Sequence, residues 1–397
     1  MRGRDIILVL TGLIFGLSAL LVHAQDRKPF KIGAVFSVTG KWSALGDPEN
    51  KTVVMIAESV NRAGGINGFP VQLIVQDDES LEGGAVGGVE KLMNQDKVLA
   101  VIGPSVSGHS LAVKPICEKA KVPMVSCAAA EAIVTPPESS RFVFKTPQLD
   151  SHVAMRILEQ VKSMGINKIA ILTDNLPFGQ QGRKQLEQYA SGMNIEIVAK
   201  EEYGPNATNM TAQLEKIRAS GAGVIVNWSA APVQTIVAKN MNALQLKCPL
   251  FFSHGFGNPR FIQAVADVGE GIMFPSGRLL AVDVLPRDHF QWKVLQDYKS
   301  AYETKYGSAI STFGGHAYDA LWLVLNAIKA KDVTPDMDVE NARQLIRDGI
   351  EQTKGWVGIA GRFNMSRTDH TGLDKYDSLE MLVITKGGKV VPLQQMK

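Results

Sequence analysis

Cysteine is scarce in this sequence, and the shortage limits how the fold can be held together. The 397 residues include three cysteines, Cys117, Cys127 and Cys248. That number is too small for a scaffold built on disulfides. Because Cys117 and Cys127 fall on a predicted helix and on the strand after it, one bond between them is possible in an oxidising compartment. Cys248 is then expected to be a buried free thiol.

Several other marks of function are also missing. Lysine and arginine number 42 against 39 acidic residues, without a basic run, so we expect no nucleic-acid partner. No G-x-G-x-x-G follows a strand, and neither a Walker A lysine nor an H-E-x-x-H helix is present. The seven histidines include no pair at i,i+4 spacing, so we expect neither a metal site nor a cofactor.

A long apolar run occurs once, over residues 6–22. Arg2 and Arg4 precede this run, and Val22-His23-Ala24 resembles a cleavage site, so residues 1–24 are predicted to be a secretory signal peptide. The alternative is a membrane anchor, for which the run is near the lower length limit. No cysteine stands at the cleavage point, which argues against a lipid anchor.

The remaining chain alternates between strand and helix patterns. The first series has strands over 31–37, 71–77, 98–103 and 123–127, with a loop over 40–46 and helices over 48–63, 84–95 and 107–120. The second has helices over 151–164, 179–191, 209–220 and 231–243 and strands over 168–173, 196–203, 224–228, 249–253 and 271–276. Three helices, over 290–305, 314–330 and 340–349, and a hairpin over 379–392 follow. Repeated strand–helix–strand units predict an α/β fold with two lobes, each built on a parallel sheet covered on both faces.

Two of the predicted strands end in small or hydroxyl residues. One stretch runs from Val101 to Ser110 and the other from Val122 to Ala130. Ligands of open α/β sheets bind beyond the carboxyl ends of the strands, so Ser107 and Ala128 are predicted to lie together in a pocket for a small carboxylate. The alternative is that Ser107 is only a helix N-cap, although one hydroxyl can serve both purposes.

An enzyme is not expected. A hydrolase built on Ser107 would be expected to have a nucleophile elbow, G-x-S-x-G, in the stretch from Gly103 to Ser110, and this stretch does not match it. Gly103-Pro-Ser-Val-Ser107 ends in serine where that pattern requires the second glycine.

Four short motifs resemble a known family. Ile32-Gly-Ala-Val-Phe-Ser-Val-Thr-Gly40, Asn61-Arg-Ala-Gly-Gly-Ile-Asn-Gly68, Gln76-Asp-Asp78 and Val101-Ile-Gly-Pro104 resemble the type I periplasmic binding proteins of the leucine/isoleucine/valine group. The resemblance implies two Rossmann-like lobes joined by a three-strand hinge. It places residues 25–148 and 278–356 in the N-terminal lobe, and residues 149–277 and 357–397 in the C-terminal lobe.

The same resemblance implies a function. It predicts a monomeric periplasmic protein that closes its lobes on a small ligand, an amino acid or a carboxylic acid, and delivers it to an inner-membrane ABC permease. A ligand-sensing module of a signalling system, built on the same lobes, is the alternative.

Candidate ligand-binding residues also come from the resemblance. The family's contacts to the ligand carboxylate fall on Ser107 and on the backbone of Ala128 and Ala129. The other positions that it implies are Trp42, Leu45, Asp150, Phe178 and Phe313. We add Phe256 and Trp228 as candidates for an apolar wall, with an ordinary core position as the alternative for each aromatic residue.

The sequence departs from the family where amino-acid binders hold the ligand's ammonium group. Ala130 replaces a hydroxyl residue, and Ser253-His-Gly-Phe256 stands where those proteins have a glutamate. A buried ammonium without a partner would cost several kcal/mol, roughly. We therefore expect a carboxylate that lacks the α-amino group, unless Asp150 or Glu131 meets an ammonium. His109 and His316 could contact a polar part of the ligand, or be ordinary surface or core residues.

Overall fold

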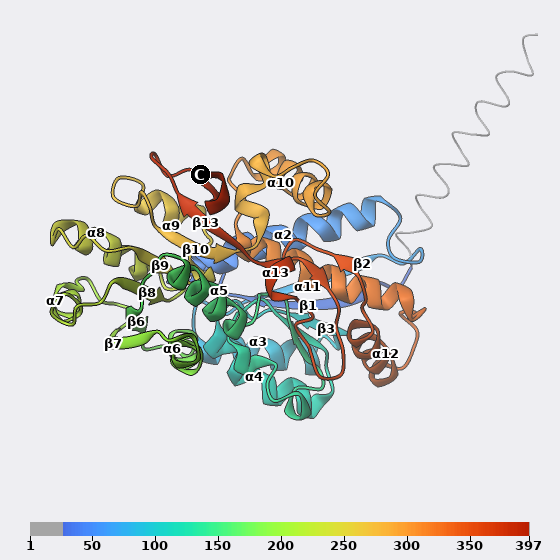
Figure 1. Cartoon of the computed structure of the whole chain (residues 1–397). Helices are drawn as coiled ribbons and strands as arrows, with labels where there is room; N and C mark the ends of the chain where they lie inside the picture. Colours follow the sequence, from blue (N-terminus) through green and yellow to red (C-terminus); the bar gives the residue numbers. More distant parts are fainter. Residues whose placement is uncertain (1–26, 397) are drawn as a thin grey trace, which may run out of the picture.

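The computed structural model describes residues 27–396 and shows two α/β lobes (Figure 1). The predicted signal peptide, residues 1–24, lies outside the described residues. Elements from the middle of the chain, coloured green and yellow, form the left-hand part of Figure 1. Blue, teal and orange elements form the right-hand part. Among residues 27–396, no helix is long and apolar enough to cross a membrane.

The first lobe contains a wholly parallel sheet of five strands in the order β2-β1-β3-β4-β5. The strands are β1 (Phe30–Phe36), β2 (Val71–Asp77), β3 (Ala100–Ile102), β4 (Met124–Ser126) and β5 (Val143–Lys145). The helices of this lobe are α2 (Ser43–Arg62), α3 (Glu82–Asn94), α4 (Ser107–Ala120), α10 (Trp292–Tyr306), α11 (Thr312–Ala330) and α12 (Val339–Glu351).

Helices cover both faces of this sheet, as a parallel sheet requires. Ile32 and Phe36 of β1 pack with apolar residues of α2, α11 and α12. Val35, which points to the opposite face, packs with apolar residues of α3 and α4. The lobe therefore has three layers, and both faces of its sheet are buried.

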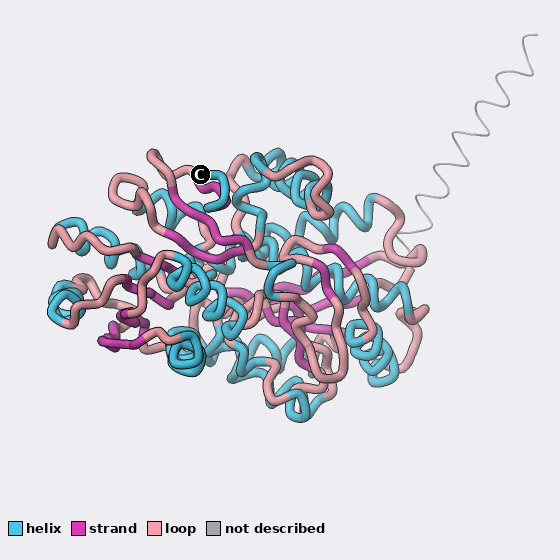
Figure 2. The backbone as a smooth tube through the Cα atoms, in the orientation of Figure 1, coloured by secondary structure: helices cyan, strands magenta, loops and turns pink. Residues whose placement is uncertain are grey.

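The second lobe contains seven strands in the order β14-β13-β10-β9-β8-β6-β7. They are β6 (Lys168–Asp174), β7 (Glu196–Tyr203), β8 (Val224–Trp228), β9 (Leu250–Phe252), β10 (Met273–Ser276), β13 (Glu380–Ile384) and β14 (Val390–Pro392). Its helices are α5 (Asp150–Ser163), α6 (Pro177–Ala190), α7 (Thr211–Ala219), α8 (Thr235–Ala243) and α9 (Pro259–Ala264), and Figure 2 shows helices around each group of strands. Five strands are mutually parallel, but β13 pairs antiparallel with both β10 and β14, so this sheet is mixed where a parallel one was predicted.

The chain passes between the lobes three times, and the last passage lies later than predicted. Residues 357–397 were assigned to the C-terminal lobe, yet Ala360, Phe363 and Leu373 are buried in the core of the first lobe. Asp319 of α11 also accepts hydrogen bonds from the backbone amides of Ile359 and Ala360, at 2.6 and 2.7 Å. The passage therefore falls between Leu373 and the start of β13.

Several predicted elements match the structure residue for residue, including α4, β2, β7 and β8. Helix α2 is different, because it begins at Ser43 and includes residues 43–46 of the predicted loop over 40–46. Gly46 is needed there for close packing, since a Cβ atom at this position would lie 2.2 Å from the carbonyl oxygen of Ser37. A glycine read as a loop residue is thus a packing residue inside a helix.

Pro48 lies inside α2 and leaves one helical carbonyl without its usual donor. Proline has no N–H, so it cannot bond to the carbonyl four residues earlier, which belongs to Ala44. The side-chain amide of Asn258, from the second lobe, donates to this oxygen at 2.7 Å. Arg260 adds an ion pair to Asp47, with 3.4 Å between nitrogen and oxygen. Both contacts join the two lobes directly.

All three cysteines are free thiols, so the bond considered between Cys117 and Cys127 is not formed. Cys117 and Cys127 are buried, whereas Cys248 is half-buried. The sulfur of Cys117 lies 3.9 Å from that of Met124. Burial raises the pKa of Cys117 to about 12 and that of Cys127 well above its usual value, which makes both thiols unreactive.

We expect all three thiols to be alkylated by iodoacetamide after unfolding without reductant, because none is bonded. In the folded protein, Cys248 should react first and the two buried thiols only on unfolding. Intact-mass spectrometry counts the added groups. A mass that accommodates one group after unfolding would instead require a disulfide.

Candidate functional site

A cavity of about 330 Å³ lies between the carboxyl ends of the two sheets. The first lobe contributes residues that follow β1, β2, β3 and β4, and the second contributes residues that follow β6, β8 and β9. The first turn of α11 completes the lining. Strand ends at which the chain leaves the sheet are the usual ligand sites of open α/β folds. The cavity is at the small end of the range typical for small-molecule sites.

One side of the cavity offers unpaired backbone amides. Helix α4 begins at Ser107, and its first internal hydrogen bond runs from the amide of Ser110 to the carbonyl of Val106. Within residues 27–396, the amides of Ser107, Gly108 and His109 donate no hydrogen bond. These donors, together with the partial positive charge of the helix start, favour an anion. Ser107, Gly108 and His109 all line the cavity.

The hydroxyl of Ser107 has a defined orientation. It accepts a hydrogen bond from the amide of Ala130 at 3.2 Å, so its own proton remains available to a ligand. The two predicted backbone donors differ. The amide of Ala128 already donates to the hydroxyl of Ser126 at 3.1 Å, while that of Ala129 has no acceptor within the described chain.

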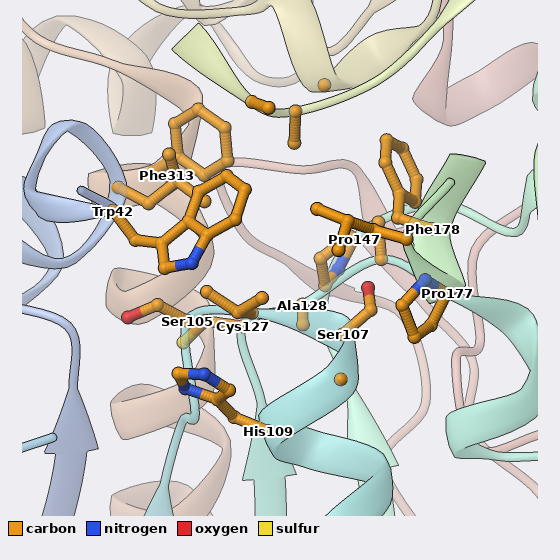
Figure 3. A pocket seen from close by; sticks show the side chains of 18 of the residues that line it. Trp42, Ser105, Ser107, His109, Cys127, Ala128, Pro147, Pro177, Phe178 and Phe313 are labelled. Atoms are coloured by element: carbon orange, nitrogen blue, oxygen red, sulfur yellow. The ribbon is translucent and has the colours of Figure 1, made fainter. Parts of the chain in front are cut away.

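Apolar side chains form the facing walls. Figure 3 shows Trp42 and Phe313 on the left and Pro177 and Phe178 on the right, with Ser107 and Ala128 below them. Leu45 also lines the cavity. Trp42, Leu45 and Phe313 belong to the same apolar cluster as the core of the second lobe. These residues therefore bind the lobes together as well as lining the cavity.

Three predicted site residues do not line the cavity. Phe256 is fully buried and stacks on Phe252, with 4.2 Å between ring centroids. The reason is a 3-10 turn over His254–Phe256, which directs His254 toward the cavity and Phe256 into the core. Trp228 is fully buried behind Phe178. Asp150 is also fully buried, at the start of α5, where it accepts a hydrogen bond from the amide of Glu131 at 2.8 Å.

Two histidines at the cavity lack hydrogen-bond partners. Neither ring nitrogen of His254 has a partner among the described residues, and the same holds for Nδ1 of His316. Burial lowers the pKa of His254 well below its usual value and that of His316 to about 3, and the nearby charge of Lys145 adds to both shifts. Both rings are therefore neutral. His109 differs, because its Nδ1 lies 2.8 Å from a carboxylate oxygen of Asp78.

The acidic groups near the cavity are engaged elsewhere or lie at its mouth. Asp174 accepts hydrogen bonds from the Ser229 hydroxyl at 2.5 Å and from the Leu176 amide at 3.1 Å. Burial raises the pKa of Asp174 to about 6. Glu131 accepts a bond from the Ser151 amide at 2.9 Å, and Glu82 is exposed at the rim. Among the described residues, no group of three potential metal ligands is found.

The structure thus brings most of the predicted ligand-binding residues to one cavity, together with several that were not predicted. The predicted residues at the cavity are Trp42, Leu45, Ser107, Ala128, Ala129, Phe178 and Phe313. The residues not predicted include Leu81, Pro147, Leu176, Pro177, Ala230, Ala231 and Thr312. Most of these follow strand ends, so the rule that singled out Ser107 could also have found them.

Comparison with known proteins identifies the family. Residues 29–388 match the model of a family described as periplasmic binding protein. The chain belongs to this family. Its members are substrate-binding proteins rather than enzymes, and its homologues are periplasmic. The match covers both lobes and all the strand ends that line the cavity.

Curated relatives are similar over nearly their whole length. A leucine-, isoleucine-, valine-, threonine- and alanine-binding protein of Pseudomonas aeruginosa is 24% identical over 354 residues, covering 88% of this chain and 90% of that protein. A Leu/Ile/Val-binding protein homolog of Brucella abortus is 24% identical over 392 residues, covering 92% and 93%.

Solved structures agree on the fold of a type I periplasmic binding protein. An extracellular ligand-binding receptor of Rhodopseudomonas palustris is 28% identical and superposes with a TM-score of 0.86, covering 92% of this chain and all of that one. The branched-chain amino acid binding protein LivJ of Streptococcus pneumoniae, solved with isoleucine, is 26% identical with a TM-score of 0.76, covering 91% and 98%. These likenesses, together with the family match, establish a solute-binding role.

Proposed function

We propose that this protein is the periplasmic solute-binding component of an ABC importer, that it acts as a monomer, and that its solute is a small carboxylate with an apolar body and no α-amino group. The observation that carries the proposal is the composition of the cavity. Unpaired amides at the start of α4 lie opposite apolar walls, and no free buried carboxylate lines the space among the described residues.

A carboxylate suits the donors of the first lobe. The amides of Ser107, Gly108 and Ala129 are available, and the Ser107 hydroxyl can donate its proton. Hydrogen bonds to a charged group contribute about 1.5–3 kcal/mol each, roughly twice as much as bonds between neutral groups. A carboxylate also complements the helix start, where a cation would be repelled.

An ammonium group lacks a matching partner. Ala130 has no hydroxyl, and its amide already donates to Ser107. Asp174, the buried acid at the cavity, is committed to Ser229 and Leu176. A ligand ammonium would lose its hydration without gaining a free carboxylate in return. This difference argues against assuming the amino-acid ligands of the curated relatives.

Both lobes supply the walls, so a ligand stabilises the arrangement in which they touch. The donors come from the first lobe, while Phe178 and His254 come from the second. A ligand that contacts both lobes shifts the population toward the closed form by its differential affinity. Closure is the signal that the proposed permease would read.

We expect benzoate-like or short branched-chain carboxylates to bind and to raise the melting temperature, whereas leucine does not. Binding to the native state alone stabilises it in proportion to the logarithm of ligand concentration. Differential scanning fluorimetry would screen the acids, and isothermal titration calorimetry would measure the affinities. Tight binding of leucine with no binding of the carboxylates would contradict the proposal.

A further inference from the structure

His254 and His316 line a cavity that already has a place for a carboxylate, and both ring nitrogens of His254 and Nδ1 of His316 have no hydrogen-bond partner among the described residues. We propose that these two histidines recognise an oxygen on the carbon next to the ligand carboxylate, so that the solute is an α-oxo or α-hydroxy acid. This inference rests on the proposed function, because it takes the carboxylate to lie on the amides at the start of α4. It goes further by naming the substituent that replaces the amino group.

The location of His254 supports this assignment. Its Nε2 lies 3.9 Å from one oxygen of Asp150, whose other oxygen accepts the amide of Glu131. The imidazole is therefore next to the segment that contains Ala129 and Ala130. The rings of Phe178 and Trp228 flank it edge-on, with centroids 5.3 and 5.9 Å away.

His316 is attached to the same region from the first lobe. Its backbone carbonyl accepts a hydrogen bond from the Thr146 hydroxyl at 2.9 Å. Lys145, one residue earlier, donates to the carbonyl of Ala129 at 2.6 Å and to that of Gln148 at 2.8 Å. Both histidines thus adjoin the end of the cavity at which the carboxylate is expected. A group that bonds to them is attached close to that carboxylate.

Neutral rings match a neutral oxygen. A neutral imidazole has one N–H donor and one acceptor nitrogen. An oxo group can accept from the N–H, and a hydroxyl can accept and donate. An ammonium at the same carbon would instead lie near the charge of Lys145, whose field already disfavours protonation of both histidines. Asp150 is fully buried and does not line the cavity, so it does not offer an ammonium a direct contact.

A matched series of ligands tests the inference. Isocaproate, α-ketoisocaproate, α-hydroxyisocaproate and leucine share one carbon skeleton and differ only at the α-carbon. Phenylpropionate, phenylpyruvate, phenyllactate and phenylalanine form the same series with an aromatic body. In one skeleton or both, we expect the oxo or hydroxy acid to bind about tenfold more tightly than the parent acid, by calorimetry.

Variants of the two histidines test whether they cause the higher affinity for the oxygenated acid. His254→Phe keeps a ring between Phe178 and Trp228 but removes both nitrogens. His316→Leu removes both nitrogens of the second histidine and leaves an apolar side chain in its place, and it serves if the first variant does not fold. Each should reduce the ratio of affinities between the oxygenated and the parent acid from about tenfold to about threefold or less, whatever the change in affinity for the parent acid itself. His152→Phe, on α5 and outside the cavity, is the matched control and should keep the full advantage.

The outcomes separate this inference from the proposed function. Equal affinity for parent and oxygenated acids would overturn the role of the histidines while leaving a carboxylate-binding protein. Tightest binding of leucine or phenylalanine would overturn both. Failure of every member of both series to bind would overturn the inference, and the benzoate screen would then decide the proposed function. An oxygen advantage that survives in both histidine variants would also overturn it.

Discussion

Replacing Ser107 by aspartate is expected to weaken carboxylate binding by more than about 100-fold. The new carboxylate would occupy the place where the ligand's own is expected, and opposing like charges in a buried site costs several kcal/mol, roughly. The fold should tolerate the change, because aspartate is favourable in the first turn of a helix. Calorimetry with the best acid from the screen measures the loss, and the melting temperature without ligand reports the fold.

Two further variants make the result interpretable. Ser107→Ala removes the hydroxyl but adds no charge, so it should cost about tenfold or less in affinity. Ser191→Asp adds the same charge at an exposed position after α6, away from the cavity, and should leave affinity unchanged. Wild-type affinity in Ser107→Asp would show that the ligand carboxylate lies elsewhere.

Gly182→Ala is expected to destabilise the protein by about 3 kcal/mol. A Cβ atom at Gly182 would lie 2.1–2.2 Å from three atoms of the Trp228 indole, which is fully buried. Relief requires the indole to shift against Phe178 and His254, and overpacking of this kind typically costs about 1–3 kcal/mol or more. The loss should occur although alanine favours helices over glycine by about 1 kcal/mol. Urea unfolding followed by tryptophan fluorescence measures it.

Gly192→Ala is the matched control for this variant. Gly192 follows the same helix, is exposed, and has no atom within 4 Å of the place that a Cβ atom would take. Its urea midpoint should stay at the wild-type value or rise slightly. Adding Trp228→Phe to Gly182→Ala should recover part of the stability, because the smaller ring leaves room for the methyl group. Equal midpoints for the two alanine variants would contradict the close contact.

The regular parts of the fold were predictable because burial imposes a visible pattern. Strands such as β8 are apolar at all but one position, and α4 begins and ends at residues that the sequence marks clearly. The start of α2 was not predictable, because Gly46 and Pro48 are typical loop residues unless their neighbours in space are known. The position of the last passage between the lobes was missed for a similar reason. An apolar residue such as Phe363 could be buried in the core of either lobe, and the sequence does not indicate which.

The candidate site likewise contains residues that the sequence could predict and residues that it could not. Ser107 and Ala129 could be placed because parallel strand ends meet at one edge of a sheet. Phe256 was misplaced because adjacent residues of a short turn face opposite ways, and the sequence does not reveal which way. His254 has no hydrogen-bond partner among the described residues because of the side chains that surround it in the folded protein. These come from α5, α6 and β8, which are distant in the sequence, so the residues adjacent to His254 could not predict this.

Pro48 has a consequence for how quickly a captured solute can leave. The carbonyl of Ala44 has no helical donor, and the amide of Asn258 fills that role across the gap between the lobes. In the proposed closure mechanism, opening the lobes breaks this hydrogen bond, leaves both groups to be hydrated by water, and also separates the Arg260–Asp47 ion pair. Under that mechanism, the residence time of the solute would depend partly on atoms that do not contact it. Substitutions at Asn258 or Arg260 could therefore change how long the solute stays bound without changing which solute the cavity selects.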